Sequence, residues 1–234
     1  MNSVLEYSVE ASNKLEQKLN SISHIPPLGF RNLLANSVFL NFLQYFSDVS
    51  ERETVGQNLS PMFFDQIISL DPFYRDYYLF LSSSTTLYAA QPQRTVDLMS
   101  KGLERINPSL LSDSFYIWRY KGVDELLFLG DSQAAKKSFR KSAEWAAFSN
   151  LPESDLVGAA SQQTAAFLER DPDSRYAQIA AWNSVLSNAM NESIRDKAIE
   201  RIRVLSEEVD PEDAHMTLSP ENPNSSSSMD TAEK

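Results

Sequence analysis

The chain has 234 residues, of which 42% are hydrophobic and 11% aromatic, enough for a sizeable core in one large domain or two small ones. Its formal net charge of −11 argues against nucleic acid, because phosphates would repel it, and favours a basic peptide or an uncharged partner. The absence of cysteine excludes disulfides, thiolate catalysis and zinc–sulfur sites, and the six scattered glycines argue against phosphate-binding loops and for helices.

The N-terminal region, residues 1–29, is predicted to be an amphipathic helix followed by a proline-rich connector. The apolar stripe of this helix consists of Val4, Tyr7, Ala11, Leu15 and Leu19. Acidic residues outnumber lysines on its polar face, whereas a helix at a membrane surface is usually basic there. We therefore expect a packing or capping helix, with a lipid anchor as the alternative.

The body of the chain, residues 30–209, shows helical spacing of apolar residues in segments joined by short loops. The predicted helices are 30–48, 60–70, 73–90, 92–106, 114–129, 132–148, 154–170, 175–190 and 192–209. Taken in order, they form about four hairpins with a period in the middle thirties, followed by a capping helix. We expect an all-α solenoid, in which helices such as 114–129 carry apolar residues on two sides.

Residues 210–234 differ in composition from the body. Asp210 and Pro211 stop the last helix, and prolines and serines follow with almost no large apolar residues. Residues 211–234 hold five acidic residues and one lysine, a net charge of −4. We expect a disordered acidic tail, which is either an inert terminus or an arm that interacts with a partner.

The most specific pattern lies in 129–139, at the turn of the third hairpin. Gly130 permits a left-handed turn, Ala135 allows two helices to approach closely, and Phe139 fills the gap between neighbouring hairpins. These residues resemble the turn and second helix of a tetratricopeptide repeat, which has a glycine, a small residue and an aromatic residue at the same spacing. The resemblance implies a tetratricopeptide-like α-solenoid.

The chain departs from the tetratricopeptide pattern in two places. Arg119, Gly122 and Val123 occupy the positions where the first helix of a repeat has its tryptophan and its leucine-glycine pair. Pro72 and Pro108, which end successive second helices, lie 36 residues apart instead of the roughly 34 of a standard repeat.

Four short segments, 39–48, 70–72, 101–103 and 129–131, look like parts of bacterial, notably cyanobacterial, tetratricopeptide proteins. Many of those carry a membrane anchor ahead of the region that matches 27–48, and related ones assist the assembly of photosynthetic complexes. The resemblance implies a scaffold that aids assembly of a membrane or photosynthetic complex. The longest apolar run here is five residues, so we expect a cytoplasmic protein or one peripheral to a membrane, unless an anchor lies outside this chain.

No group of residues indicates catalysis. The two histidines, His24 in the connector and His215 in the tail, lie outside the predicted body, where neither a catalytic triad nor a histidine metal site fits. No phosphate loop, nucleophile elbow or paired-histidine motif occurs. We expect no enzyme, no cofactor and no metal.

Charged residues within 114–129 leave alternatives open. Asp124 and Glu125 are either a buried acid pair, which an enzyme or a binding site could use, or part of a solvated face. We expect the solvated face, on which Lys121 pairs with Glu125 four residues later. Arg119 lies between two aromatic residues where a repeat usually has an apolar side chain, so a position in a groove is equally open.

The function we expect is partner binding in a concave groove lined by the first helices of successive hairpins. The candidate partner-binding residues are Asn41, Gln44, Tyr78, Tyr116, Arg119, Tyr120 and Asp124. Tyrosine offers a large contact area and a polar tip, and the two amides lie where this fold often contacts a peptide backbone, although a solvated face is their alternative. The alternative function is that of a fixed structural subunit in a larger assembly.

Overall fold

The structure, a computed structural model, describes residues 29–48 and 59–207 and five separate residues ahead of them, Asn13, Lys14, Gln17, Leu19 and Ser21. Every regular element in these ranges is a helix, which confirms the all-α prediction for this part of the chain. None of the described helices is long and apolar enough to cross a membrane. Most of the predicted N-terminal helix, the connector up to residue 28 and the acidic tail lie outside the described residues.

The helices begin and end close to the predicted positions. They are α2 (Arg31–Ser47), α4 (Ser60–Leu70), α5 (Arg75–Leu81), α6 (Pro92–Leu103), α7 (Phe115–Asp124), α8 (Ser132–Ala146), α9 (Ser154–Arg170), α10 (Arg175–Asn188) and α11 (Glu192–Glu207), with two π-helical segments, η2 (Ser82–Tyr88) and η3 (Glu125–Leu129). The ends agree because prolines and short polar side chains mark them. Asp131, for example, accepts a hydrogen bond of 2.8 Å from the backbone N–H of Ala134 at the start of α8.

Two helices that the sequence predicts as continuous α-helices change to π-helix in their last turns. α5 continues as η2 and α7 continues as η3. In the first case the hydroxyls of Ser83 and Ser84 donate to the backbone carbonyls four residues earlier, where they compete with the backbone ladder. Each wide turn is followed by a left-handed residue, Ala90 with φ 52° and Gly130 with φ 72°.

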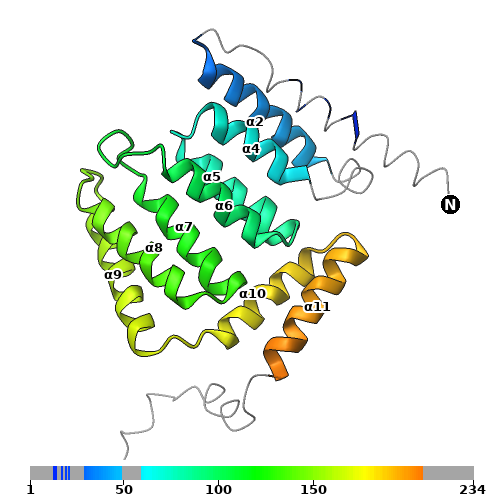
Figure 1. Cartoon of the computed structure of the whole chain (residues 1–234), viewed down its shortest axis with the longest axis vertical. Coiled ribbons are helices and arrows are strands. Elements are labelled where there is room, and N and C mark those ends of the chain that lie inside the picture. The colour runs from blue at the N-terminus through cyan, green and yellow to red at the C-terminus, as the bar shows by residue number, and fades with distance from the viewer. Residues whose placement is uncertain are drawn as a thin grey trace, which may run out of the picture.

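The helices pack in consecutive pairs (Figure 1). α2 lies against α4, α5–η2 against α6, and α7–η3 against α8, and α9 extends this series by packing on α8. Neighbouring pairs also touch through α4 with α6 and α5 with α7. The three pairings of the first six predicted helices are therefore as expected.

The fourth predicted pair, α9 with α10, is not found. α10 packs along α11, and it also contacts η2 and η3, so the α10–α11 pair lies across the π-helical ends of two earlier helices (Figure 1). The loop before α10 is held by Ser132, whose hydroxyl donates a 2.6 Å hydrogen bond to the Pro172 carbonyl. After α9, the chain therefore does not continue the row of helices that α2 to α9 form.

The main hydrophobic core lies within the first two pairs. Phe42 is surrounded by aromatic rings, with Phe64 at 4.7 Å and Phe63 at 5.8 Å between ring centroids. Leu19, one of the separate residues ahead of α2, is also buried in this cluster. A smaller cluster packs Phe139 of α8 against α9, so this aromatic fills a gap between helices, although α9 does not form the predicted neighbouring hairpin with α10.

Candidate functional site

A pocket of about 580 Å³ lies between α2 and the start of α5. We call it the α2–α5 pocket; its wall includes Asn36, Phe39, Leu40, Phe73, Tyr74 and Tyr77. Leu40 is 61% exposed and Tyr74 is 49% exposed, so large apolar groups are open to solvent there. Exposed apolar side chains gathered in a hollow indicate a surface that binds another molecule.

The pocket has a polar centre made by Asn36 and Tyr77. The Tyr77 hydroxyl donates a 2.6 Å hydrogen bond to the Asn36 Oδ1 atom. Burial raises the pKa of Tyr77 to about 12, so the hydroxyl keeps its proton at neutral pH. The Asn36 side-chain NH₂ group has no hydrogen-bond partner among the described residues and is left to donate to a ligand.

The first turn of α5 connects this pocket to α7. The Arg75 guanidinium lies 5.2 Å from the centre of the Tyr116 ring, and its NH2 nitrogen lies 2.7 Å from the Asp76 carboxylate. Asp113 lies 3.7 Å from the same guanidinium. Tyr116 in turn stacks on Tyr120 at a centroid distance of 6.1 Å.

These contacts join three helices in one surface, which we call the aromatic face. It consists of Asn36 and Leu40 on α2, Phe73, Tyr74 and Arg75 at the start of α5, and Tyr116 and Tyr120 on α7. Each of these helices is the first member of its pair. Two of the predicted partner-binding residues, Tyr116 and Tyr120, thus lie together here.

Asn41 and Gln44 lie on α2 without lining the pocket. Gln44 is exposed, and the partly buried Asn41 donates a 2.9 Å hydrogen bond to the carbonyl of Ser37. The pocket is lined by the neighbouring stripe of α2, which includes Asn36 and Leu40. The two predicted residues therefore lie on the helix that lines the pocket, but on a different stripe of it.

Tyr78 belongs to the core and not to a surface. Its side chain is fully buried, its hydroxyl donates a 2.8 Å hydrogen bond to the Pro72 carbonyl, and its ring packs against Gly102. The expectation that Tyr78 binds a partner is therefore corrected. Tyr77 is buried as well, but its side chain forms part of the pocket wall.

Arg119 points away from the aromatic face toward α9. Its NH1 nitrogen donates a 3.0 Å hydrogen bond to the Ser161 hydroxyl, and its guanidinium lies 5.9 Å from the centre of the Phe139 ring. The side chain is partly buried. Arg119 therefore joins α7, α8 and α9 instead of reaching the face.

Asp124 and Glu125 are both buried, so the expected solvated face is corrected. The predicted contact of Lys121 with Glu125 exists, but Ser138 of α8 also donates to Glu125, at 2.5 Å, and the group is enclosed. Ser82 donates to Asp124 at 2.8 Å. Burial raises the pKa of Asp124 to about 7, and full burial removes it from any partner surface.

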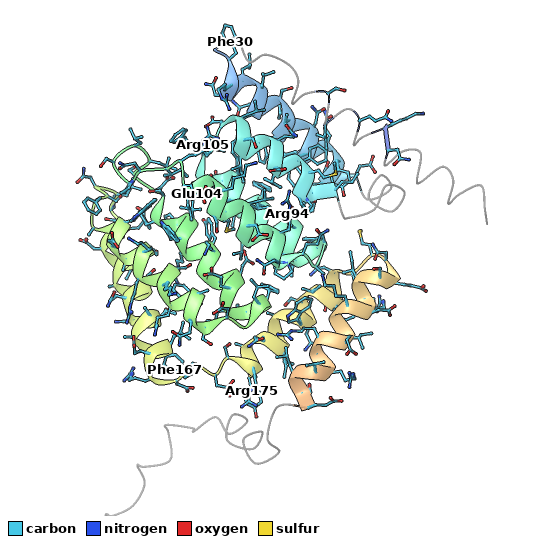
Figure 2. The ribbon with its side chains drawn as sticks, viewed as in Figure 1. Phe30, Arg94, Glu104, Arg105, Phe167 and Arg175 are labelled. Atoms are coloured by element: carbon cyan, nitrogen blue, oxygen red, sulfur yellow. The ribbon has the colours of Figure 1, made fainter. Side chains whose placement is uncertain are left out.

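A second hollow, of about 780 Å³, lies between the start of α6, the end of η3, α10 and α11. We call it the α6–α11 groove; its wall includes Arg94, Phe128, Trp182, Lys197, Arg201 and Val204. Figure 2 shows Arg94 at the end of α6 that is opposite Arg105. The sequence analysis did not find this groove, because its wall comes from four separate segments that only the tertiary packing brings together.

The described residues offer no metal site. Within 29–48, 59–207 and the separate residues ahead of them, no three His, Cys, Asp or Glu side chains gather closely enough to hold an ion. His24 and His215 lie outside the described residues.

Comparison of the chain with family models, with curated proteins and with solved structures gives no match. The tetratricopeptide resemblance and what it implies therefore stay predictions.

Proposed function

We propose that this chain is a tetratricopeptide-like scaffold that binds an extended segment of a partner protein along the aromatic face. The observation that carries the proposal is that side chains from three successive first helices, α2, α5 and α7, meet on one surface. First helices supply the inner surface of a helical-hairpin solenoid, and binding there is how such folds hold peptides.

The chemistry of the aromatic face suits a peptide. The free NH₂ group of Asn36 donates to a peptide carbonyl, and the exposed sides of Leu40, Phe73 and Tyr74 receive apolar side chains. Arg75 is balanced by two nearby carboxylates, so the face carries no excess positive charge. In a chain of net charge −11, the preferred segment is apolar or aromatic and either uncharged or weakly basic.

A binding role also fits the groups that are present better than catalysis does. The face offers the Asn36 amide, apolar side chains and the phenols of Tyr74, Tyr116 and Tyr120, which bind but do not supply an acid or base near neutral pH. Among the described residues, Asp124, whose pKa burial raises to about 7, is enclosed in the core.

The test is to select binding peptides from a random display library on the full chain and to measure their affinity by fluorescence anisotropy. We expect Tyr74→Ala and Tyr116→Ala each to weaken binding at least tenfold. Tyr176→Ala, which removes a comparably exposed tyrosine from α10, is the matched control and should leave the affinity unchanged. Equal binding by all variants would show that the aromatic face is not the site, and selection of no peptide would overturn the scaffold role.

A fixed place in a larger assembly is the second candidate, favoured by exposed apolar groups on α2. Phe30 is 62% exposed and projects from the end of the molecule in Figure 2, and Leu33 is 63% exposed. If the chain assembles through this surface, light scattering of the full chain should give a mass above that of one copy. Leu33→Glu should then lower the measured mass. A single-copy mass for the full chain leaves the peptide scaffold as the better account.

A further inference from the structure

The α6–α11 groove has an apolar floor with two positive charges on one side. Phe128 and Trp182 form part of the floor, and their rings meet at a centroid distance of 6.0 Å. Lys197 and Arg201 lie four residues apart on α11 and both line the groove. Such a combination recognises a ligand that has carboxylates beside an apolar group.

The two cations lack acidic partners within the described part of the chain. Lys197 Nζ donates to the Ala90 carbonyl, and Arg201 reaches only the Gln178 side-chain oxygen, at 3.5 Å. Two carboxylates also line the groove: Glu200 is paired with Arg203, and Asp97 accepts a 2.9 Å hydrogen bond from the uncharged Gln93 side chain. Burial lowers the pKa of Lys197, a cost that an incoming carboxylate would offset.

Arg94, the third cation of the groove, is already paired. Its NH2 nitrogen lies 3.3 Å from the Asp65 carboxylate. It lies in the first turn of α6, where the positive end of the helix dipole adds to the field of Lys197 and Arg201. Three cations and two carboxylates line the groove, so an otherwise acidic protein keeps a local site with a net charge of +1 there.

The segment that follows α11 has the complementary chemistry. The last described residue of α11 is Glu207, about one turn beyond the groove residue Val204. Residues 208–218 contain four acidic residues and no lysine or arginine, and Met216 and Leu218 follow the pair Glu212-Asp213. Carboxylates are thus followed a few residues later by large apolar side chains, which matches the cations and the aromatic rings of the groove.

The length of the segment also fits. A segment of six residues can span up to about 20 Å, and Arg201 lies about 9 Å from Glu207 along α11, so residue 213 is within reach of Arg201. Attachment to α11 makes binding intramolecular, so a weak interaction suffices to fill the groove.

We propose that residues 208–218 of this chain fold back along α11 and bind in the α6–α11 groove, with Glu212 and Asp213 against Lys197 and Arg201. Met216 and Leu218 then cover Phe128 and Trp182. Residues 208–218 would then compete for this groove with an acidic segment of another protein. This inference does not depend on the aromatic face.

The absence of cysteine from the chain allows a direct test in the full-length protein. A nitroxide label on Ala214→Cys broadens NMR signals near it, and the chain has three tryptophan indole N–H signals to observe, from Trp118, Trp145 and Trp182. We expect at least a threefold loss of intensity for Trp182, relative to the reduced label. Trp118 and Trp145, which pack on each other at 5.6 Å, should keep their intensity and report an intact fold.

Charge variants separate binding from mere proximity to the helix end. Arg201→Glu should restore the Trp182 signal, whereas Arg195→Glu, an exposed position of α11 outside the groove, should not. Adding Glu212→Lys and Asp213→Lys to Arg201→Glu should bring the broadening back. An unchanged Trp182 signal in the labelled protein, or equal broadening with and without Arg201→Glu, overturns the proposal.

Discussion

Ser82 donates a 2.8 Å hydrogen bond to Asp124, and this contact joins the two helices that end as π-helix. Ser82 is the first residue of η2, and Asp124 is the residue directly before η3. Asp124 is fully buried, and its Oδ1 atom has no hydrogen-bond partner. A buried carboxyl with one unsatisfied oxygen is more stable with its proton on than off, and this decides how it responds to pH.

The unfolding free energy of the Asp124→Asn variant should rise, relative to that of the unsubstituted protein, as the pH rises. The pKa of Asp124 is about 7 in the folded protein and about 4 in an unfolded chain. The folded state therefore binds the proton more tightly, and stability is lost as the pH rises through 7. Between pH 5 and pH 8 the difference in unfolding free energy between variant and parent should grow by about 2–3 kcal/mol.

Urea unfolding at several pH values measures this difference. Asp97→Asn, an exposed acid on α6, is the control and should show a nearly constant difference. A constant difference for Asp124→Asn as well would contradict the raised pKa.

Gly130→Ala should destabilise the protein by about 2 kcal/mol. Half of this comes from the left-handed backbone, where φ is 72°. The rest comes from Gln178, whose Oε1 would lie 2.8 Å from the new Cβ and would have to give up its position beside Ser174.

Gly29 provides the matched comparison for that substitution. It also has a positive φ, 87°, but nothing lies within 4 Å of a Cβ there, so Gly29→Ala should cost only about 1 kcal/mol. Equal losses in the two variants, measured by urea unfolding, would mean that Gln178 does not constrain the turn.

Gly102→Ala should lower the melting temperature by about 5–10 °C. Its Cβ would lie 2.1 Å from the Tyr78 hydroxyl oxygen, and that ring is fully buried and held by its hydrogen bond to Pro72. Overpacking of this kind costs about 1–3 kcal/mol or more. Gly158→Ala in α9, where the nearest atom is 3.1 Å away, should change the melting temperature far less, and calorimetry on both variants compares them.

Arg119→Ala should lower stability by about 1–2 kcal/mol and leave peptide binding on the aromatic face unchanged. The substitution removes the hydrogen bond to Ser161 and the contact with Phe139, both at the junction of α7 with α8 and α9. Parallel urea unfolding and anisotropy measurements separate the two effects. Weaker peptide binding at full stability would instead place Arg119 on the face.

Local chemistry predicted the helices of this protein and part of its candidate site. Apolar spacing and prolines placed the helices close to where the structure has them within 30–48 and 59–207, and Gly130 has the left-handed backbone expected of it. Aromatic residues on the third hairpin indicated Tyr116 and Tyr120. Periodicity could not tell that both members of Tyr77-Tyr78 would be buried, because the same spacing also allows one of the two on a surface.

What the sequence alone determined is therefore the all-α class, the order of the helices and the acidic character of the chain. Only the tertiary structure decided that α10 pairs with α11, that Asp124 and Glu125 are enclosed, and that the α6–α11 groove exists. Helix formation depends on residues three or four apart, so it can be read from a short window. Burial and grooves depend on contacts between segments as distant as Ala90 and Lys197, which no local pattern encodes.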